Sequence, residues 1–292
     1  MAIETFDDLE MNYIDRFVHK EFIRQEYSFG QVYKYLDRYM DWEQREIASL
    51  TINPKVKKDK TIWFLWMQGL DSAPRLVKKC YESIIANKPD DYDVVVLDDE
   101  NLTDYLKLPE CVIDKFSRGM ITKTHLSDII RAGLLFLYGG CWIDSTVYCM
   151  ERIPDFMLEG ELFVFRFPGI MTKTVLEISS WWIRAKSGSR LMEAVWRILE
   201  YYWSEEEELI DYYLFHIIFS KLVNEDKKCG ELLKKSLYYN SGNAHVLYSK
   251  MNKAYDQQEW DSIKAISPVQ KLSYKSRFLQ GDLDSYYMHI VS

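Results

Sequence analysis

The chain has 292 residues, of which 48% are hydrophobic and 28% are charged, so it is long enough for one large α/β domain or two small ones and too apolar to be disordered. Its formal net charge of -8 argues against nonspecific nucleic-acid binding, which needs a basic surface. An anionic ligand therefore needs local positive charge, which a bound divalent cation can supply.

The cysteine pattern and the lack of a long apolar segment bear on location. The five cysteines show no paired spacing and their number is odd, so we expect reduced thiols in a cytoplasmic protein. The N-terminal sequence has no apolar signal segment, and no run is long enough for a transmembrane helix. Peripheral contact with the inner face of a membrane stays open because of a small basic cluster at Lys55, Lys57, Lys58 and Lys60, which a solvated loop would also explain.

Residues 1–58 are expected to form a helical segment that packs on a main domain of residues 59–292. The apolar residues of this segment keep helical spacing in two stretches, 13–22 and 32–40. Packing on the core is the simplest role for them, and binding of an acceptor or of another protein is the alternative.

The main domain opens with a strand–helix–strand pattern. TIWFLWMQG (61–69) is typical of a buried strand, residues 72–89 of an amphipathic helix with Pro74 near its start, and YDVVVLDDEN (92–101) of a second strand. This order predicts a parallel sheet covered on both faces. Because ligands bind beyond the carboxyl ends of such strands, the candidates are Trp66, Gln68, Asp98 and Asp99.

A second helix and strand follow at residues 124–140 and 141–149. Thr124 or Ser127 can cap the helix, and Gly139-Gly140 can end it, allowing a sharp turn and close approach of a ligand to the backbone. The strand carries Asp144 to the rim of the expected site, where it could ligate a hard cation, although an aspartate that starts a turn would look the same. The hydroxyl residues Ser145 and Thr146 come next.

Asp128 and Arg131 are one helical turn apart and share a face of the predicted helix. They could form only a local salt bridge in the first turn, where the helix dipole favours an acid. Alternatively, Asp128 accepts hydrogen bonds from sugar hydroxyls and Arg131 holds a sugar or phosphate oxygen.

The C-terminal half is expected to hold a strand at 161–167 and helices at 189–203 and 208–223, with Asp211 on the last of these. In the late segment SPVQKLSYK (267–275), Ser267 and Lys271 could approach a diphosphate once a C-terminal segment closes over it. Surface positions are the alternative for both.

The segment HLSDIIRAGLLFLYGGCWIDSTV (125–147) contains SD-x-x-R, an apolar helix and then YGG-x-W-x-D. In motif order and spacing it resembles the core signature of glycosyltransferase family 32, in its capsular polysaccharide synthesis branch. The resemblance extends over residues 60–275 and implies an α/β fold of the GT-A type, a Rossmann-like domain that binds a nucleotide sugar, usually with Mn²⁺ or Mg²⁺.

By this resemblance, Trp66 stacks on the nucleotide base, and Asp128 and Arg131 hold the donor sugar and ribose. Tyr138 matches the tyrosine before the double glycine, where packing at the helix end is the alternative. Asp144 matches the first acid of the DXD motif. Asp211 falls near the acceptor or the transferred sugar, and a solvated acid is the alternative there.

The second acid of DXD is replaced by Thr146, and a hydroxyl is a much weaker ligand for a hard cation than a carboxylate. Either Asp144 binds the metal with help from elsewhere, with His245 or Asp211 as helpers, or metal dependence is weak. A structural or surface position is the alternative for His245.

The expected function is a retaining glycosyltransferase. It would move a sugar from a nucleotide diphosphate sugar, most simply UDP-linked, to a saccharide or lipid-linked saccharide acceptor in capsular or other surface polysaccharide synthesis. Two alternatives stay open: a nucleotide-sugar-binding protein with little turnover, and a metal-dependent phospho- or nucleotidyltransferase. The latter usually needs two metals and more acids.

Overall fold

The computed structural model describes residues 28–45, 52–167, 176–275 and 284–292, and the structural statements below refer to these residues. At its centre is a six-stranded sheet with the order β2-β1-β3-β6-β5-β7. From one edge to the other, the strands are β2 (Asp93–Leu97), β1 (Thr61–Leu65), β3 (Gly140–Ile143), β6 (Ile178–Ala185), β5 (Leu162–Arg166) and β7 (Tyr239–Asn240).

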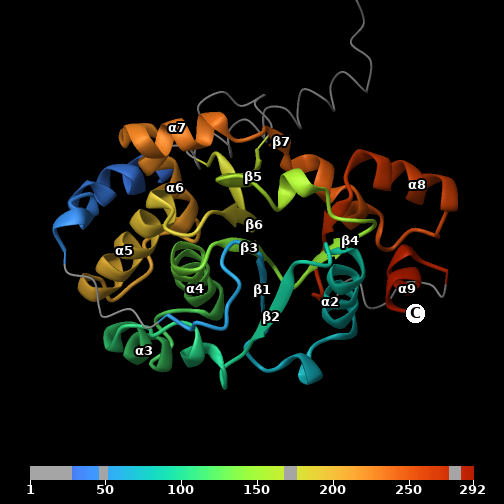
Figure 1. Ribbon diagram of the computed structural model, residues 1–292, viewed down its shortest axis with the longest axis horizontal. Coiled ribbons are helices and arrows are strands. Elements are labelled where there is room, and N and C mark those ends of the chain that lie inside the picture. Colours follow the sequence, from blue (N-terminus) through green and yellow to red (C-terminus); the bar gives the residue numbers. More distant parts are fainter. Residues whose placement is uncertain (1–27, 46–51, 168–175, 276–283) are drawn as a thin grey trace, which may run out of the picture.

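Helices cover both faces of this sheet (Figure 1). One side carries α3 (Glu110–Ser117), α4 (Lys123–Leu137), α5 (Arg190–Glu205), α6 (Leu214–Glu225) and α7 (Lys227–Lys235), and the other carries α2 (Arg75–Asn87), α8 (Gln257–Ile266) and α9 (Tyr286–Val291). Short 3-10 turns lie at Leu36–Tyr39, Trp42–Gln44, Leu70–Ser72, Leu102–Asp104, Asp155–Met157, Ser241–His245 and Leu247–Lys250.

The sheet is mainly parallel. β2, β1 and β3 run parallel, β6 is antiparallel to both of its neighbours, and β5 and β7 again run with the first three strands. The predicted α/β class with a mainly parallel sheet and helical additions is therefore confirmed, and the arrangement agrees with the GT-A expectation.

Burial on both faces explains why β1 reads as an uninterrupted apolar run. Ile62 and Phe64 pack into one hydrophobic cluster, whereas Trp63 and Leu65 pack into the cluster formed with α4, α5 and α6. A strand with two covered faces does not alternate between apolar and polar residues.

The strand predicted at 141–149 is wrong as a single element. β3 ends at Ile143, and β4 (Val147–Cys149) pairs antiparallel with β8 (Val269–Lys271) in a separate two-stranded sheet. The backbone N–H of Val147 donates to the carbonyl of Asp144 at 3.0 Å, which closes a turn over the intervening Ser145 and Thr146. Aspartate and hydroxyl residues favour such turns.

Two helix starts also differ from the prediction. Thr122, not Thr124 or Ser127, caps α4, because its side chain accepts a hydrogen bond from the backbone N–H of His125. Asp128 therefore lies in the second turn, where the helix dipole contributes less. α6 begins only at Leu214, so Asp211 precedes the helix.

The described part of the N-terminal segment contributes side chains to the hydrophobic cluster on one side of the sheet. Residues 28–35 are helical, and Phe29, Val32, Leu36 and Tyr39 are buried in the cluster that also contains α5. The apolar stretch at 13–22 lies outside the described residues, and the domain boundary at 58/59 stays a prediction. Within the described ranges, no helix combines the length and apolarity needed to cross a membrane.

Candidate active site

A cleft of about 500 Å³ lies at the carboxyl ends of β1 and β3. Parallel strands of an open α/β sheet bring their following loops together at this edge. Seven of the sequence-predicted site residues meet here, namely Trp66, Gln68, Arg131, Asp144, Ser145, Thr146 and Lys271.

Asp144 is fixed at the rim by the sheet. Its backbone N–H donates to the carbonyl of Trp181 in β6 at 2.9 Å. Its carboxylate accepts hydrogen bonds from Trp142 Nε1 at 2.8 Å and from Lys271 Nζ at 2.9 Å. Burial would raise the pKa of this carboxyl, but Lys271 and Arg131 outweigh burial and lower the pKa to about 2. The group is therefore ionised near neutral pH.

Arg131 joins the two acids into one network. Its side chain is only 4% exposed, and its Nη2 lies 3.4 Å from Asp128 Oδ1 and 3.5 Å from Asp144 Oδ1. It also donates hydrogen bonds to the carbonyl of Ser180 at 2.6 Å and to the hydroxyl of Ser127 at 3.2 Å. The predicted pairing of Asp128 with Arg131 is thus present, and it extends to the acid at the end of β3.

Asp128 lies behind Arg131 rather than on the surface of the cleft. Its side chain is 8% exposed. Burial raises the pKa of its carboxyl to about 7; the charge of Arg131 opposes this rise and that of Asp144 adds to it. Asp128 is therefore only partly ionised near neutral pH.

This pKa predicts a pH-dependent stability difference. The pKa of Asp128 is about 7 in the folded protein and about 4 in an unfolded chain, so its ionisation favours unfolding as the pH rises through that window. Asp128→Asn cannot ionise at this position. The free energy of unfolding of the variant minus that of wild type should therefore be larger at pH 7 than at pH 4, by up to about 4 kcal/mol. Urea titrations at both pH values measure this gain, and a difference that stays constant with pH would contradict it. Asp114→Asn, at an exposed site, is the control.

Lys271 reaches the cleft from the small second sheet. β8 places Lys271 opposite Val147 of β4, directly after the turn that holds the site. Its ammonium group donates to Asp144 Oδ2 at 2.9 Å and to Thr146 Oγ1 at 2.6 Å. The side chain is 21% exposed and lines the cleft, so it can also meet a ligand.

Among its described lining residues, the cleft carries three cationic side chains, Lys123, Arg131 and Lys271, and a single carboxylate, Asp144. The N-terminal end of α4 lies at the same place, since Lys123, Thr124 and Ser127 line the cleft, and its dipole adds positive potential. In a chain of net charge -8, this cleft favours an anionic ligand.

A family model for capsular polysaccharide synthesis proteins matches residues 12–290. The chain belongs to this family. The sequence resemblance is thereby confirmed at the level of the capsular polysaccharide synthesis family, whereas glycosyltransferase family 32 and a working DXD motif stay predictions.

Parts of this family member are similar to curated glycosyltransferases. It is 30% identical over 129 residues to the O-glycosyltransferase braB of Annulohypoxylon truncatum, covering 41% of this chain and 30% of the relative. It is 28% identical over 128 residues to the O-glycosyltransferase PaGT of Phomopsis amygdali, covering 41% and 31%. The chain thus spans less than a third of the length of these relatives. Among solved structures, the PaToxG glycosyltransferase matches 73% of this chain and 85% of its own, at 12% identity and a TM-score of 0.40.

The double glycine of this family member is structural. Gly139 and Gly140 have φ of 67° and 90°. Gly139 directly precedes β3 and Gly140 is its first residue, so both lie at the opposite end of this strand from Asp144. A Cβ on Gly140 would lie 2.1 Å from the carbonyl oxygen of Thr61. The turn was predicted correctly. The expected approach of a ligand is wrong, because the protein's own backbone fills that space.

Tyr138 packs at the end of the helix, which was the alternative interpretation of this residue. It is fully buried at the end of α4, its hydroxyl accepts from the N–H of Asn53 at 2.8 Å, and it donates to the carbonyl of Tyr105 at 2.9 Å. Its ring packs against Trp63. It is absent from the lining of the cleft, so its prediction as a substrate-binding residue is corrected.

Asp98 and Ser267 turn toward their own loops. The Asp98 carboxylate accepts from the backbone N–H groups of Glu100 and Asn101, both at 3.0 Å. Ser267 is fully buried and donates to the carbonyl of Val269 at 2.8 Å. Both side chains satisfy local backbone groups and neither lines the cleft.

Asp211 and His245 also lie outside the lining residues. Asp211 accepts from the N–H of Tyr213 at 2.7 Å and shapes the turn before α6, next to Tyr212, which does line the cleft. The His245 ring bonds through Nδ1 to the carbonyl of Ser241 at 2.8 Å. The structure therefore does not bring His245 to Asp144 as a second ligand.

Sequence reasoning missed several cleft residues. Tyr212, Tyr274, Lys123 and Trp142 all line the site. Tyr274 packs edge-on against Trp66, with ring centroids 5.3 Å apart. The high aromatic content was the available signal, but it does not say which rings reach the cleft.

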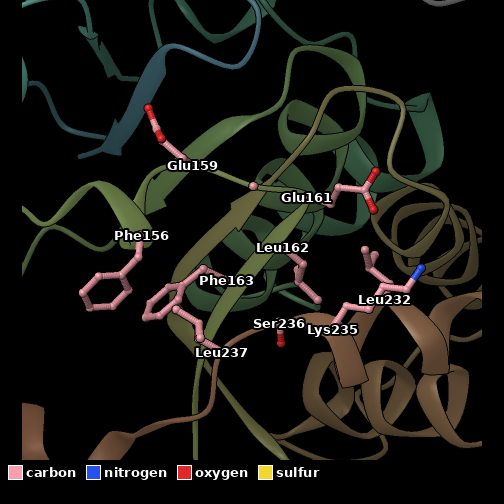
Figure 2. Close-up of a pocket in the computed structure, with 10 residues that line it drawn as sticks. Phe156, Glu159, Glu161, Leu162, Phe163, Leu232, Lys235, Ser236 and Leu237 are labelled. Carbon is pink, nitrogen blue, oxygen red and sulfur yellow. The ribbon is translucent and has the colours of Figure 1, made fainter.

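The described residues contain other cavities, but these lie elsewhere. Figure 2 shows one of about 360 Å³, lined by Phe156, Phe163 and Leu237 together with Glu161 and Lys235. It lies beside the first residue of β5, Leu162, which is aligned through β6 with the beginning of β3. This cavity therefore lies near the beginning of β3, at the opposite end of the strands from Asp144.

Proposed function

We propose that this protein is a retaining glycosyltransferase of the GT-A type. It moves a sugar from a nucleoside diphosphate sugar, UDP-linked, to a hydroxyl of a saccharide or lipid-linked saccharide during synthesis of a capsular or other surface polysaccharide. The observation that carries the proposal is the convergence of Arg131, Lys271 and Asp144 in one cleft beside Trp66. The family and the names of the partial relatives support the same reaction class.

In the proposed reaction, the acceptor oxygen bonds to the anomeric carbon as the bond from that carbon to the diphosphate breaks on the same face. The bonding electrons leave with the diphosphate, which takes up the hydroxyl proton. Arg131 and Lys271 stabilise the negative charge that develops on the leaving group. Asp144 fixes these two cations relative to each other, and Asp128 fixes Arg131 from the other side. Correct placement of the reacting groups supplies the rest of the catalysis.

Turnover with a panel of UDP-sugars and saccharide acceptors tests the proposal. We expect release of UDP together with a product whose mass has increased by one sugar and whose anomeric configuration, read by NMR, is that of the donor. Release of a nucleoside monophosphate would indicate a phosphotransferase instead.

A binding protein with little turnover is the second candidate, and Thr146 at the place of the second DXD acid favours it. Its signature would be quenching of tryptophan fluorescence by UDP-sugars without release of UDP. Measuring tryptophan fluorescence and UDP release in the same UDP-sugar titration therefore separates the two candidates.

Trp66 gives a direct test of nucleotide placement. Its ring lines the cleft at the end of β1, and we propose that it stacks on the base. Trp66→Ala should weaken UDP binding by roughly 1–3 kcal/mol, the range for losing one base–aromatic stack. Calorimetric titration with UDP measures the change, and an unaltered affinity would refute stacking. An unchanged thermal midpoint shows that the fold survives the substitution.

A further inference from the structure

The lining of the cleft does not suit a divalent cation. Mn²⁺ and Mg²⁺ prefer several oxygen ligands, with carboxylates first. Here Asp144 is the one carboxylate among the lining residues that the structure describes, and Thr146 offers only a hydroxyl. Across the described ranges, no group of three or more His, Cys, Asp or Glu side chains is placed to hold a metal ion.

The carboxylate that a metal would need already has three partners. Trp142 and Arg131 approach Oδ1, at 2.8 and 3.5 Å, and Lys271 donates to Oδ2 at 2.9 Å. A divalent ion at this carboxylate would therefore lie beside two fixed cations and gain only one negative charge, an arrangement that electrostatic repulsion disfavours.

The ammonium group of Lys271 lies between the two side chains that correspond to the acids of a DXD motif. It donates to Asp144 at 2.9 Å and to Thr146 at 2.6 Å, so it bridges these positions as a cation. A threonine here is a suitable partner for an ammonium group, because the hydroxyl oxygen accepts a hydrogen bond without adding negative charge.

The backbone around Lys271 is held firmly. Gln270 is fully buried; its Oε1 accepts from the N–H of Leu247 at 3.0 Å, and its Nε2 donates to the carbonyl of Asn243 at 3.1 Å. On the other side of Lys271, the N–H of Leu272 donates to the carbonyl of Thr146 at 2.8 Å. The ammonium group is thus placed in advance of any ligand, as electrostatic stabilisation requires.

We propose that Lys271 takes the place of the divalent cation: its ammonium group, with Arg131, neutralises the diphosphate of the donor, and the protein binds nucleoside diphosphates without a metal ion. This inference rests on the proposed function, since it concerns the same donor. In this proposal, Lys271 supplies the positive charge that a metal ion would otherwise supply. Lys271 and Asp144 are 127 residues apart in the sequence.

The first test is calorimetric binding of a panel of nucleoside diphosphates, UDP included, to the full chain in excess EDTA and in excess Mn²⁺. We expect a dissociation constant that differs by less than about threefold between the two conditions. Binding that disappears in EDTA and returns with Mn²⁺ or Mg²⁺ would overturn the metal-free site and leave the proposed glycosyltransferase intact. If no nucleoside diphosphate binds in either condition, the proposed function fails together with the inference.

Variants of Lys271 provide the second test. Lys271→Met should raise the dissociation constant in EDTA at least about tenfold, a loss of about 1.4 kcal/mol, and Lys271→Arg should keep most of the affinity. Lys264→Met removes an equally charged lysine from α8, outside the cleft, and should bind as wild type does. Equal affinity of Lys271→Met and wild type would refute the role of the ammonium group.

A double variant makes the inference testable by a gain of metal dependence. Lys271→Met combined with Thr146→Asp removes the ammonium group and restores the second acid. We expect this variant to bind the nucleoside diphosphate better with Mn²⁺ than in EDTA, by about tenfold or more, unlike wild type. Thermal midpoints of all variants identify any that fail to fold. If Lys271→Met or the double variant does not fold, the affinity of Lys271→Arg and the wild-type titration in EDTA test the inference instead.

Discussion

Asp144→Asn is expected to lower kcat for sugar transfer by on the order of 100-fold, while UDP affinity changes only a few-fold. The asparagine keeps the shape and the hydrogen bond from Trp142, but it loses the charge that holds Lys271 and Arg131 in place. A displacement of about 1 Å in a group that stabilises the leaving diphosphate has an effect of this size. Initial rates at saturating UDP-sugar, together with calorimetric titration with UDP, measure both quantities.

Asp155→Asn is a matched control, because Asp155 is exposed and pairs with the exposed Arg152. It should leave kcat unchanged. Wild-type turnover in Asp144→Asn would remove this carboxylate from the site. A large loss of thermal stability with an equal loss of UDP binding would make its role structural instead.

Arg131→Met is expected to lower the free energy of unfolding by about 3–5 kcal/mol and to abolish transfer. Arg131 is buried, and its removal leaves Asp128 without its cation and the carbonyl of Ser180 without its donor. Denaturant titration at neutral pH measures the loss. Adding Asp128→Asn should recover part of the lost stability, because the unpaired buried acid is then gone.

Arg118→Met tests whether loss of an exposed arginine, here the residue that directly follows α3, would give the same result. Arg118 is half exposed and forms a helical-spacing ion pair with Asp114. Exposed pairs of this kind contribute little to stability, so this variant should be nearly as stable as wild type. Similar losses in Arg118→Met and Arg131→Met would argue against the buried network.

Much of the site could be predicted from the sequence because it depends on local patterns. Trp66 and Asp144 directly follow apolar strands, and parallel neighbours place the ends of such strands at one edge. Asp128 and Arg131 meet through helical spacing alone. The resemblance to the capsular polysaccharide synthesis family connected these features into one site.

Other predictions failed where a motif does not determine orientation. Gly139 and Gly140 belong to the same short motif as Asp144, but they lie at the beginning of β3, whereas Asp144 directly follows its last residue, so they lie at opposite ends of this strand. Asp98 follows a strand as Asp144 does, yet its carboxylate closes its own turn. A local pattern does not reveal which backbone groups compete for a side chain.

The sequence by itself determined the α/β order of elements, the turn that exposes Asp144 and the pairing of Asp128 with Arg131, because each depends on residues close together in the chain. Only the tertiary structure decided that Lys271 lies against Asp144 and that Tyr274 lies against Trp66. These contacts follow from the antiparallel pairing of β4 with β8, and such long-range pairing depends on how the whole chain packs rather than on the propensity of either segment.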